Sequence, residues 1–73
     1  MTLADVKRGD EFIISRISDK KVRAQAIRFG ISEGANLSCG DKIPGGPVIL
    51  KKNFQEIAVG RNLAKNIIID IKN

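Results

Sequence analysis

Apolar and polar residues alternate along most of this chain, and this period of two predicts a fold built mainly from short β-strands. The clearest case is the segment 67–72, IIIDIK, in which three isoleucines at every second position share one face. The segment 11–18, EFIISRIS, is rich in β-branched residues and also predicts a strand. Strict alternation places Phe12, Ile14 and Arg16 on one face of that strand.

Glycine, proline and asparagine divide the second half of the chain into short elements. Ala35 to Gly40 predicts a second strand after a turn. In Ile43 to Pro47 two prolines bracket two glycines, which predicts a loop because neither helix nor paired strand tolerates that pattern. Val48 to Lys52 and Glu56 to Gly60 flank Asn53, a residue that tolerates positive φ, and therefore predict a hairpin.

One segment has the helical period instead. Three apolar residues share a narrow helical face and are expected to pack on the core: Val22, Ala26 and Phe29. Asp19 is placed to cap the first turn of this helix, because its carboxylate can accept from free amides there. Gly30 is placed to end it, and Ile31 to close the cap by an apolar contact. Shorter helical turns are expected at residues 2–5 and 60–66.

Five short strands, one helix after the first strand and a closing turn predict a mainly β fold, a small and partly open barrel. With 73 residues we expect a single domain over residues 1–73. No apolar run approaches the roughly 20 residues of a membrane span, and the first residues lack the layout of a signal peptide. We therefore expect a cytoplasmic protein with no direct insertion into membranes.

The chemistry of the chain argues against catalysis. It has no histidine, so the commonest general base is absent, and Cys39 has no second cysteine. We assign no cofactor and no metal, because Cys39 with Asp41 supplies only two ligands. A metal bridged between two copies of the chain stays open, and so does weak self-association.

The net charge of +5 favours an anionic partner, but the basic residues are scattered among acids. Small basic barrels that bind RNA need aromatic platforms on which bases stack. Three phenylalanines are few for that purpose, so the sequence argues against nucleic acid. A small basic RNA-binding barrel remains an alternative.

A set of residues along nearly the whole chain is similar to one known family. These residues are Arg23, the run IRFGI at 27–31, Gly34, Pro44, Gly46, Pro47, the run IAV at 57–59, Arg61, the pair at 63–64, and the three isoleucines at 67–69. In this set the chain resembles the FeoA family, small cytoplasmic proteins encoded with the ferrous iron permease FeoB. The same domain is similar to the C-terminal module of iron-dependent repressors.

The resemblance implies an SH3-like barrel with an inserted helix, in agreement with the strand pattern. It also implies an accessory role in bacterial ferrous iron uptake, by docking on the cytosolic GTP-binding domain of FeoB. On the exposed shoulder of the helix, the contact surface is expected to comprise Arg23, Ile27, Arg28 and Ile31, together with Ile43 and Pro44 of the loop. A regulatory module related to the repressors is the second alternative.

Overall fold

The structure, a computed structural model, describes residues 1–72 and shows five antiparallel strands in one sheet. The strands are β1 (Glu11–Ile17), β2 (Asn36–Lys42), β3 (Val48–Lys52), β4 (Gln55–Val59) and β5 (Ile67–Lys72). The helical elements are the 3-10 turn η1 (Leu3–Asp5), α1 (Lys20–Arg28) and the single turn α2 (Arg61–Ala64). The predicted elements are therefore present, with bounds that differ by one or two residues.

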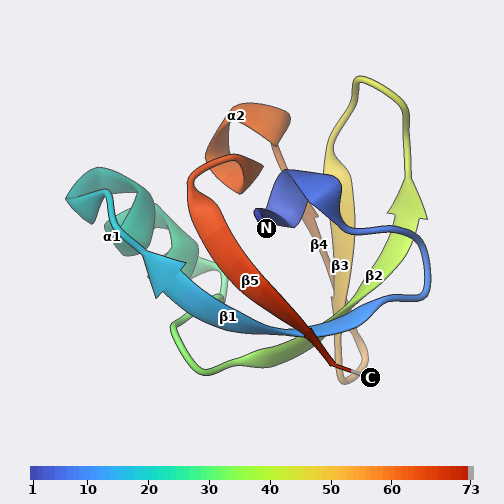
Figure 1. Ribbon diagram of the computed structural model, residues 1–73, viewed down its shortest axis with the longest axis horizontal. Coiled ribbons are helices and arrows are strands. Elements are labelled where there is room, and N and C mark those ends of the chain that lie inside the picture. Colours follow the sequence, from blue (N-terminus) through green and yellow to red (C-terminus); the bar gives the residue numbers. More distant parts are fainter. Residues whose placement is uncertain (73) are drawn as a thin grey trace.

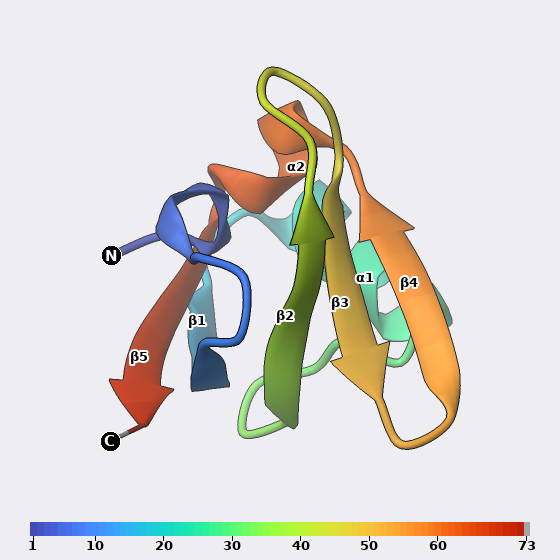
Figure 2. The ribbon, with the colours of Figure 1, turned by 90° about the vertical axis from the view of Figure 1, so that its right-hand side faces the viewer.

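The sheet has the order β4-β3-β2-β1-β5 and curls around one core without closing. β1 and β5 cross the direction of β3 and β4, while α1 lies beyond the end of β1 (Figure 1). β4 and β5 are the two edge strands of the sheet, with α2 connecting them along the chain (Figure 2). The prediction of a mainly β, partly open barrel with one inserted helix is confirmed.

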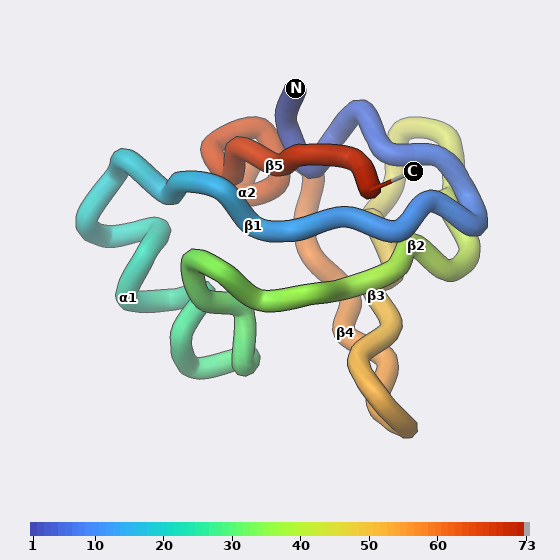
Figure 3. The backbone as a smooth tube through the Cα atoms, turned by 60° about the horizontal axis from the view of Figure 1, so that its bottom comes forward, coloured from blue at the N-terminus to red at the C-terminus, as the bar shows by residue number. Residues whose placement is uncertain are grey.

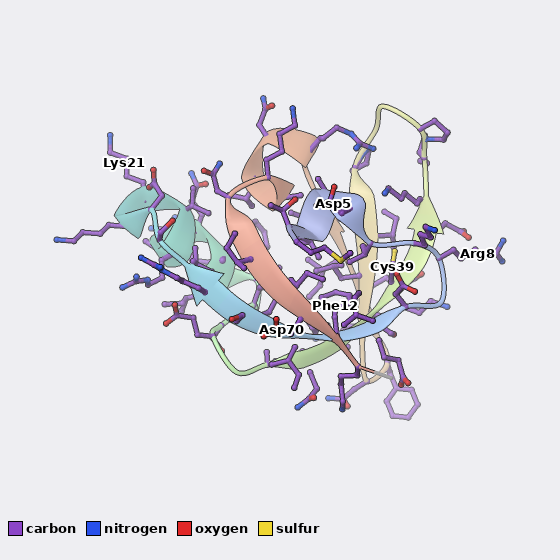
Figure 4. All side chains as sticks on the ribbon, in the orientation of Figure 1. Asp5, Arg8, Phe12, Lys21, Cys39 and Asp70 are labelled. Atoms are coloured by element: carbon purple, nitrogen blue, oxygen red, sulfur yellow. The ribbon has the colours of Figure 1, made fainter. Side chains whose placement is uncertain are left out.

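The core is almost entirely aliphatic. Phe12 and Cys39 point into it from β1 and β2, whereas Arg8 and Lys21 project away from the fold (Figure 4). The buried residues are Leu3, Val6, Phe12, Ile14, Ile17, Ala26, Ile31, Leu37, Cys39, Val48, Leu50, Val59, Ala64, Ile67 and Ile69. No charged or polar residue is buried among the described residues, so the hydrophobic effect supplies the stability of the interior.

β1 departs from strict alternation at Ser15. Ile14 pairs with Ile69 and Arg16 with Ile68, so Ser15 is an extra residue without a partner on β5. This β-bulge shifts the phase of the strand, so that Ile17 is buried and Arg16 is exposed. The expectation that Arg16 shares the face of Phe12 and Ile14 is wrong, because the bulge avoids the cost of burying a guanidinium.

α1 begins and ends at the residues that its local sequence predicts. The carboxylate of Asp19 accepts from the amides of Lys21 and Val22 at 2.8 and 3.1 Å. Gly30 has φ +79°, and its amide donates to the carbonyl of Ile27 at 3.0 Å, while the amide of Ile31 donates to Ala26 at 2.9 Å. These two bonds form a Schellman motif, which the buried Ile31 completes by packing near Ala26 in the core.

Candidate partner-binding surface

The exposed side of α1 is basic and carries one large apolar residue. The nine residues KKVRAQAIR contain four cations and no acid. Ile27 lies on this side with 57% of its surface exposed, one turn beyond Arg23. The prediction that Ile27 is exposed is confirmed, and a cationic rim around an apolar residue suits a partner with the opposite charge.

Arg23 holds the end of β1 as well as contributing charge. Its Nε and Nη2 atoms donate to the main-chain carbonyl of Ile17 at 3.1 and 2.8 Å. The amide of the same residue, Ile17, donates to a carboxylate oxygen of Glu33 at 3.1 Å. Ile67 of β5 lies beside Ile17 on one side, and β2 pairs with β1 only as far as Ile13 on the other. The side chains of Arg23 and Glu33 therefore pair both main-chain groups of Ile17, and Arg23 has a structural role that the sequence did not indicate.

Ile31 is not available to a partner. Its side chain is fully buried, at 0% exposure, in the same cluster as Ala26. The position after the helix-ending glycine turns the chain back toward the sheet, which directs Ile31 inward. The expectation that Ile31 belongs to the contact surface is therefore wrong, although its predicted role in the cap is correct.

Ile43 and Pro44 are exposed, but they lie far from α1. The loop of residues 43–47 and the helix occupy opposite ends of the molecule (Figures 1 and 3). Arg61 of α2, whose Nη2 atom is 3.5 Å from the carbonyl of Ile43, is the neighbour of this loop. The structure does not bring the six residues of the expected surface together, so α1 and the loop are two separate candidate contacts.

Phe29 belongs to the exposed surface and not to the core. It caps the C-terminal end of α1, and 52% of its surface is exposed. The expectation of a core position is wrong because the helix ends at Arg28, so the helical period no longer applies one residue later. Gly30 was the signal in the sequence that could have corrected this expectation, since a helix-ending glycine makes the residue before it the C-cap and not part of the helical face. We define the α1 surface as Arg23, Ile27, Arg28 and Phe29.

The described residues show no arrangement of ligands for a metal centre. No group of three or more His, Cys, Asp or Glu side chains lies together within residues 1–72. Cys39 is buried, and burial raises the pKa of its thiol. Asp41, two residues later, is exposed, and its Oδ1 atom lies 3.5 Å from Nε of Arg8. Of the two side chains weighed as a metal pair, Cys39 is therefore buried in the core while Asp41 faces solvent.

A shallow depression of about 180 Å³ lies on the outer face of the sheet, across β1, β2, β3 and β5. Its lining includes three lysines, Lys51, Lys52 and Lys72, and one acid, Glu11. Lys52 donates to the carbonyl of Gly30 at 2.9 Å, and Lys72 donates to Asn36 at 3.0 Å. Two of the three ammonium groups are thus engaged within the chain, which weakens this depression as an anion site.

The match to a family model decides the classification of the chain. The model of the FeoA domain matches residues 1–71. The chain belongs to the FeoA family. None of the curated proteins that were compared matches it, and no helix within residues 1–72 has the length and apolar character needed to cross a bilayer.

Solved structures agree with the FeoA fold. A crystal structure of FeoA, described as an iron uptake regulatory protein, has a TM-score of 0.88 at 24% identity, covering 99% of this chain and all of that one. FeoA of Stenotrophomonas maltophilia, crystallised with zinc and described as a prokaryotic SH3 domain protein, has a TM-score of 0.78 at 18% identity, covering 96% and 89%. ScaR with bound Cd²⁺ has a TM-score of 0.82 at 21% identity, with 96% of this chain matching 35% of ScaR.

Proposed function

We propose that this FeoA chain is a non-enzymatic, cytoplasmic, single-domain accessory protein of bacterial ferrous iron uptake. Its partner in this proposal is the cytosolic GTP-binding domain of a FeoB-like permease, and its contact is the α1 surface. The family match over residues 1–71 supports the role in iron transport. The exposed Ile27 among the cations of α1 is the observation that carries the choice of surface.

The physical case for α1 rests on desolvation. Ile27 and Phe29 expose 57% and 52% of their surfaces to water, so covering them contributes hydrophobic free energy without disturbing the core. The four cations of the helix add long-range attraction to an acidic partner and exclude basic ones. Docking of this kind weakens as salt is added, because the exposed charges are screened.

The experiment is an amide-resolved NMR titration of the chain with the isolated GTP-binding domain of the FeoB from the same cell. It is run with and without guanine nucleotide. Shifts confined to residues 20–30 support the proposal. Shifts confined to residues 43–47 assign the contact to the loop instead, and the absence of shifts in every nucleotide state refutes docking on this domain.

The chain offers a matched pair of variants for this titration. Ile27→Asp and Ile43→Asp remove the same side chain from sites with similar exposure, 57% and 54%, at opposite ends of the molecule. Both variants should keep the fold, because neither residue belongs to the core. Ile27→Asp should abolish binding while Ile43→Asp leaves it unchanged, and the reverse result identifies the loop containing Ile43 and Pro44 as the contact.

A regulatory module is the second candidate function, and the likeness to the manganese regulator SloR favours it. That likeness shows the fold alone, over 34% of the SloR chain. Specific binding of operator DNA by this chain would support the regulatory function over the transport role. For the RNA-binding alternative, a binding curve that barely responds to salt would remove it, since phosphate contacts make affinity fall steeply with salt.

A further inference from the structure

The two end strands of the sheet are covered to different extents. At β5 the N-terminal segment adds a short pairing: the amide of Ile69 donates to the carbonyl of Met1 at 2.9 Å, and Thr2 forms an isolated bridge with Ile68. β4, at the other end, has no neighbour on its outer side within residues 1–72 (Figure 2). The sheet therefore has one partly covered edge and one open edge.

The open edge presents main-chain groups that face water. Lys52 and Gln55 flank a two-residue turn, so they form a hydrogen-bonded pair. Alternation along an antiparallel ladder then directs the N–H and C=O groups of Glu56 and Ala58 away from β3. No hydrogen bond from these two amides to any other part of residues 1–72 is present.

Apart from the charge of Glu56, β4 lacks the devices by which edge strands resist pairing. Its pairing with β3 runs without a bulge from Gln55 to Val59, and its sequence QEIAV contains no proline and no lysine. Two apolar side chains on or next to β4 are accessible to solvent. Ile57 is half-buried, and Phe54 at the tip of the hairpin is fully exposed. The hairpin tip projects beyond the rest of the fold (Figure 3).

We propose that β4 pairs antiparallel with β4 of a second copy of this chain, about a twofold axis at Ile57. In this register the outward groups of Glu56 meet those of Ala58 of the second copy, as a hydrogen-bonded pair. The two Ile57 side chains face each other at the closer, non-hydrogen-bonded position. Phe54 lies opposite Gly60 of the second copy, where a ring can cover a residue that has no side chain.

The register is self-complementary, which is the reason to choose a second copy over a foreign strand. Gly60 has open space where a Cβ would lie, so the ring of Phe54 meets no obstacle there. Glu56 faces an alanine across the interface and pairs with Lys51 on its own side, so no like charges are directly opposed. A single-strand contact falls at the small, transient end of interfaces, below about 1,200 Å².

The proposed dimer is independent of docking on FeoB and has the opposite dependence on salt. Both copies carry a net charge of +5, so their mutual repulsion is screened as salt is added and pairing strengthens. Docking of the basic α1 surface on an acidic partner weakens under the same change. A dimer can therefore form whether or not the FeoB proposal holds, and each can fail separately.

The test is sedimentation and NMR of the full chain at concentrations up to about 1 mM, where weak protein contacts become populated. We expect concentration-dependent association in fast exchange, with amide shifts centred on residues 54–60. A chain that stays monomeric at the highest concentration overturns the proposal, as do shifts centred elsewhere. A monomeric chain whose β4 amides shift on addition of an extended peptide assigns the edge to a foreign strand and also overturns it.

Substitution at position 58 separates edge pairing from stability. Ala58→Pro removes an outward amide that the ladder with β3 does not use, while Ala58→Val keeps that amide and favours a strand. The proline variant should weaken association at least about tenfold, and the valine variant should retain it. Where Ala58→Pro does not fold, Phe54→Ser replaces it, because Phe54 contributes nothing to the core. Unchanged association in folded Ala58→Pro, or in folded Phe54→Ser where that variant is used, refutes the proposed pairing.

Discussion

Arg23 donates two hydrogen bonds to the main-chain carbonyl of Ile17, at 2.8 Å from Nη2 and 3.1 Å from Nε. The bonds connect the first turn of α1 to the last residue of β1. They explain how a nine-residue helix with little apolar contact keeps its position beside the sheet. Arg23 therefore belongs to the candidate surface and to the support of that surface at once.

Replacement of Arg23 by alanine should lower the free energy of unfolding by about 1 kcal/mol, because a charge-assisted pair at a partly exposed site is lost. Arg28→Ala is the matched control, because it removes the same charge from the same helix and the Arg28 side chain makes no hydrogen bond within residues 1–72. Its free energy of unfolding should stay within about 0.5 kcal/mol of the parent. Urea denaturation measures both. Equal stability of the two variants would show that the contact with Ile17 contributes nothing.

The N-terminal turn should open in acid because of Asp5. Its carboxylate accepts from the amide and hydroxyl of Thr2 at 2.9 and 3.1 Å, and these bonds hold the pKa of Asp5 below its ordinary value. A lowered pKa means that the stabilisation is present above the ordinary aspartate pKa. It is lost as pH falls through the lowered value.

Hydrogen exchange at Ile69 reports this opening, since the amide of Ile69 bonds to the carbonyl of Met1. Its protection should fall at low pH, and should already be reduced at neutral pH in Asp5→Asn. Amides of the β3 and β4 hairpin serve as the internal control, because they lie away from the turn (Figure 2). Protection of Ile69 that does not differ between Asp5→Asn and the parent would argue against this role of Asp5.

The thiol of Cys39 should react slowly in the native chain. Its side chain is 3% exposed, and burial raises the pKa of the thiol, so the reactive thiolate is scarce at neutral pH. The unfolded thiol ionises near pH 8.5, so the unfolded state loses its proton first and stability falls as pH rises above that value. A thiol reagent should modify Cys39 rapidly only in denaturant, and Cys39→Val should remove this part of the alkaline dependence. Rapid modification in buffer would contradict the buried position of Cys39. It would also restore the hypothesis that this thiol helps to bind a metal bridged between two copies of the chain.

Elements with a local cause could be predicted from the sequence. The caps of α1 depend on Asp19 and Gly30, and both act within a few residues of their own positions. The hairpin depends on the positive φ of Asn53, and the loop at 43–47 on two prolines and two glycines. Because each of these features is a property of adjacent residues, it needs no knowledge of the rest of the fold.

The candidate site was only partly predictable. Ile27 was correctly expected to be exposed because helical phase alone decides which side it occupies. Phe29 was placed wrongly because the helix ends one residue before it, and Ile31 was placed wrongly on the surface because the chain turns back toward the sheet after Gly30. The distance between α1 and the Ile43 loop depends on how the sheet curls, and that curvature cannot be predicted from the local sequence pattern.

The sequence by itself determined the strands, the helix with its caps and the membership of the FeoA family, since periodicity, turn residues and motif spacing are written along the chain. Only the tertiary structure decided the bulge at Ser15, the bond from Arg23 to Ile17 and the open edge of β4. These features arise between segments that are distant in sequence or depend on strand register. The free energies of the bulge, the Arg23 bond and the open edge depend on which main-chain groups are hydrogen-bonded within the assembled sheet and which are hydrogen-bonded to water.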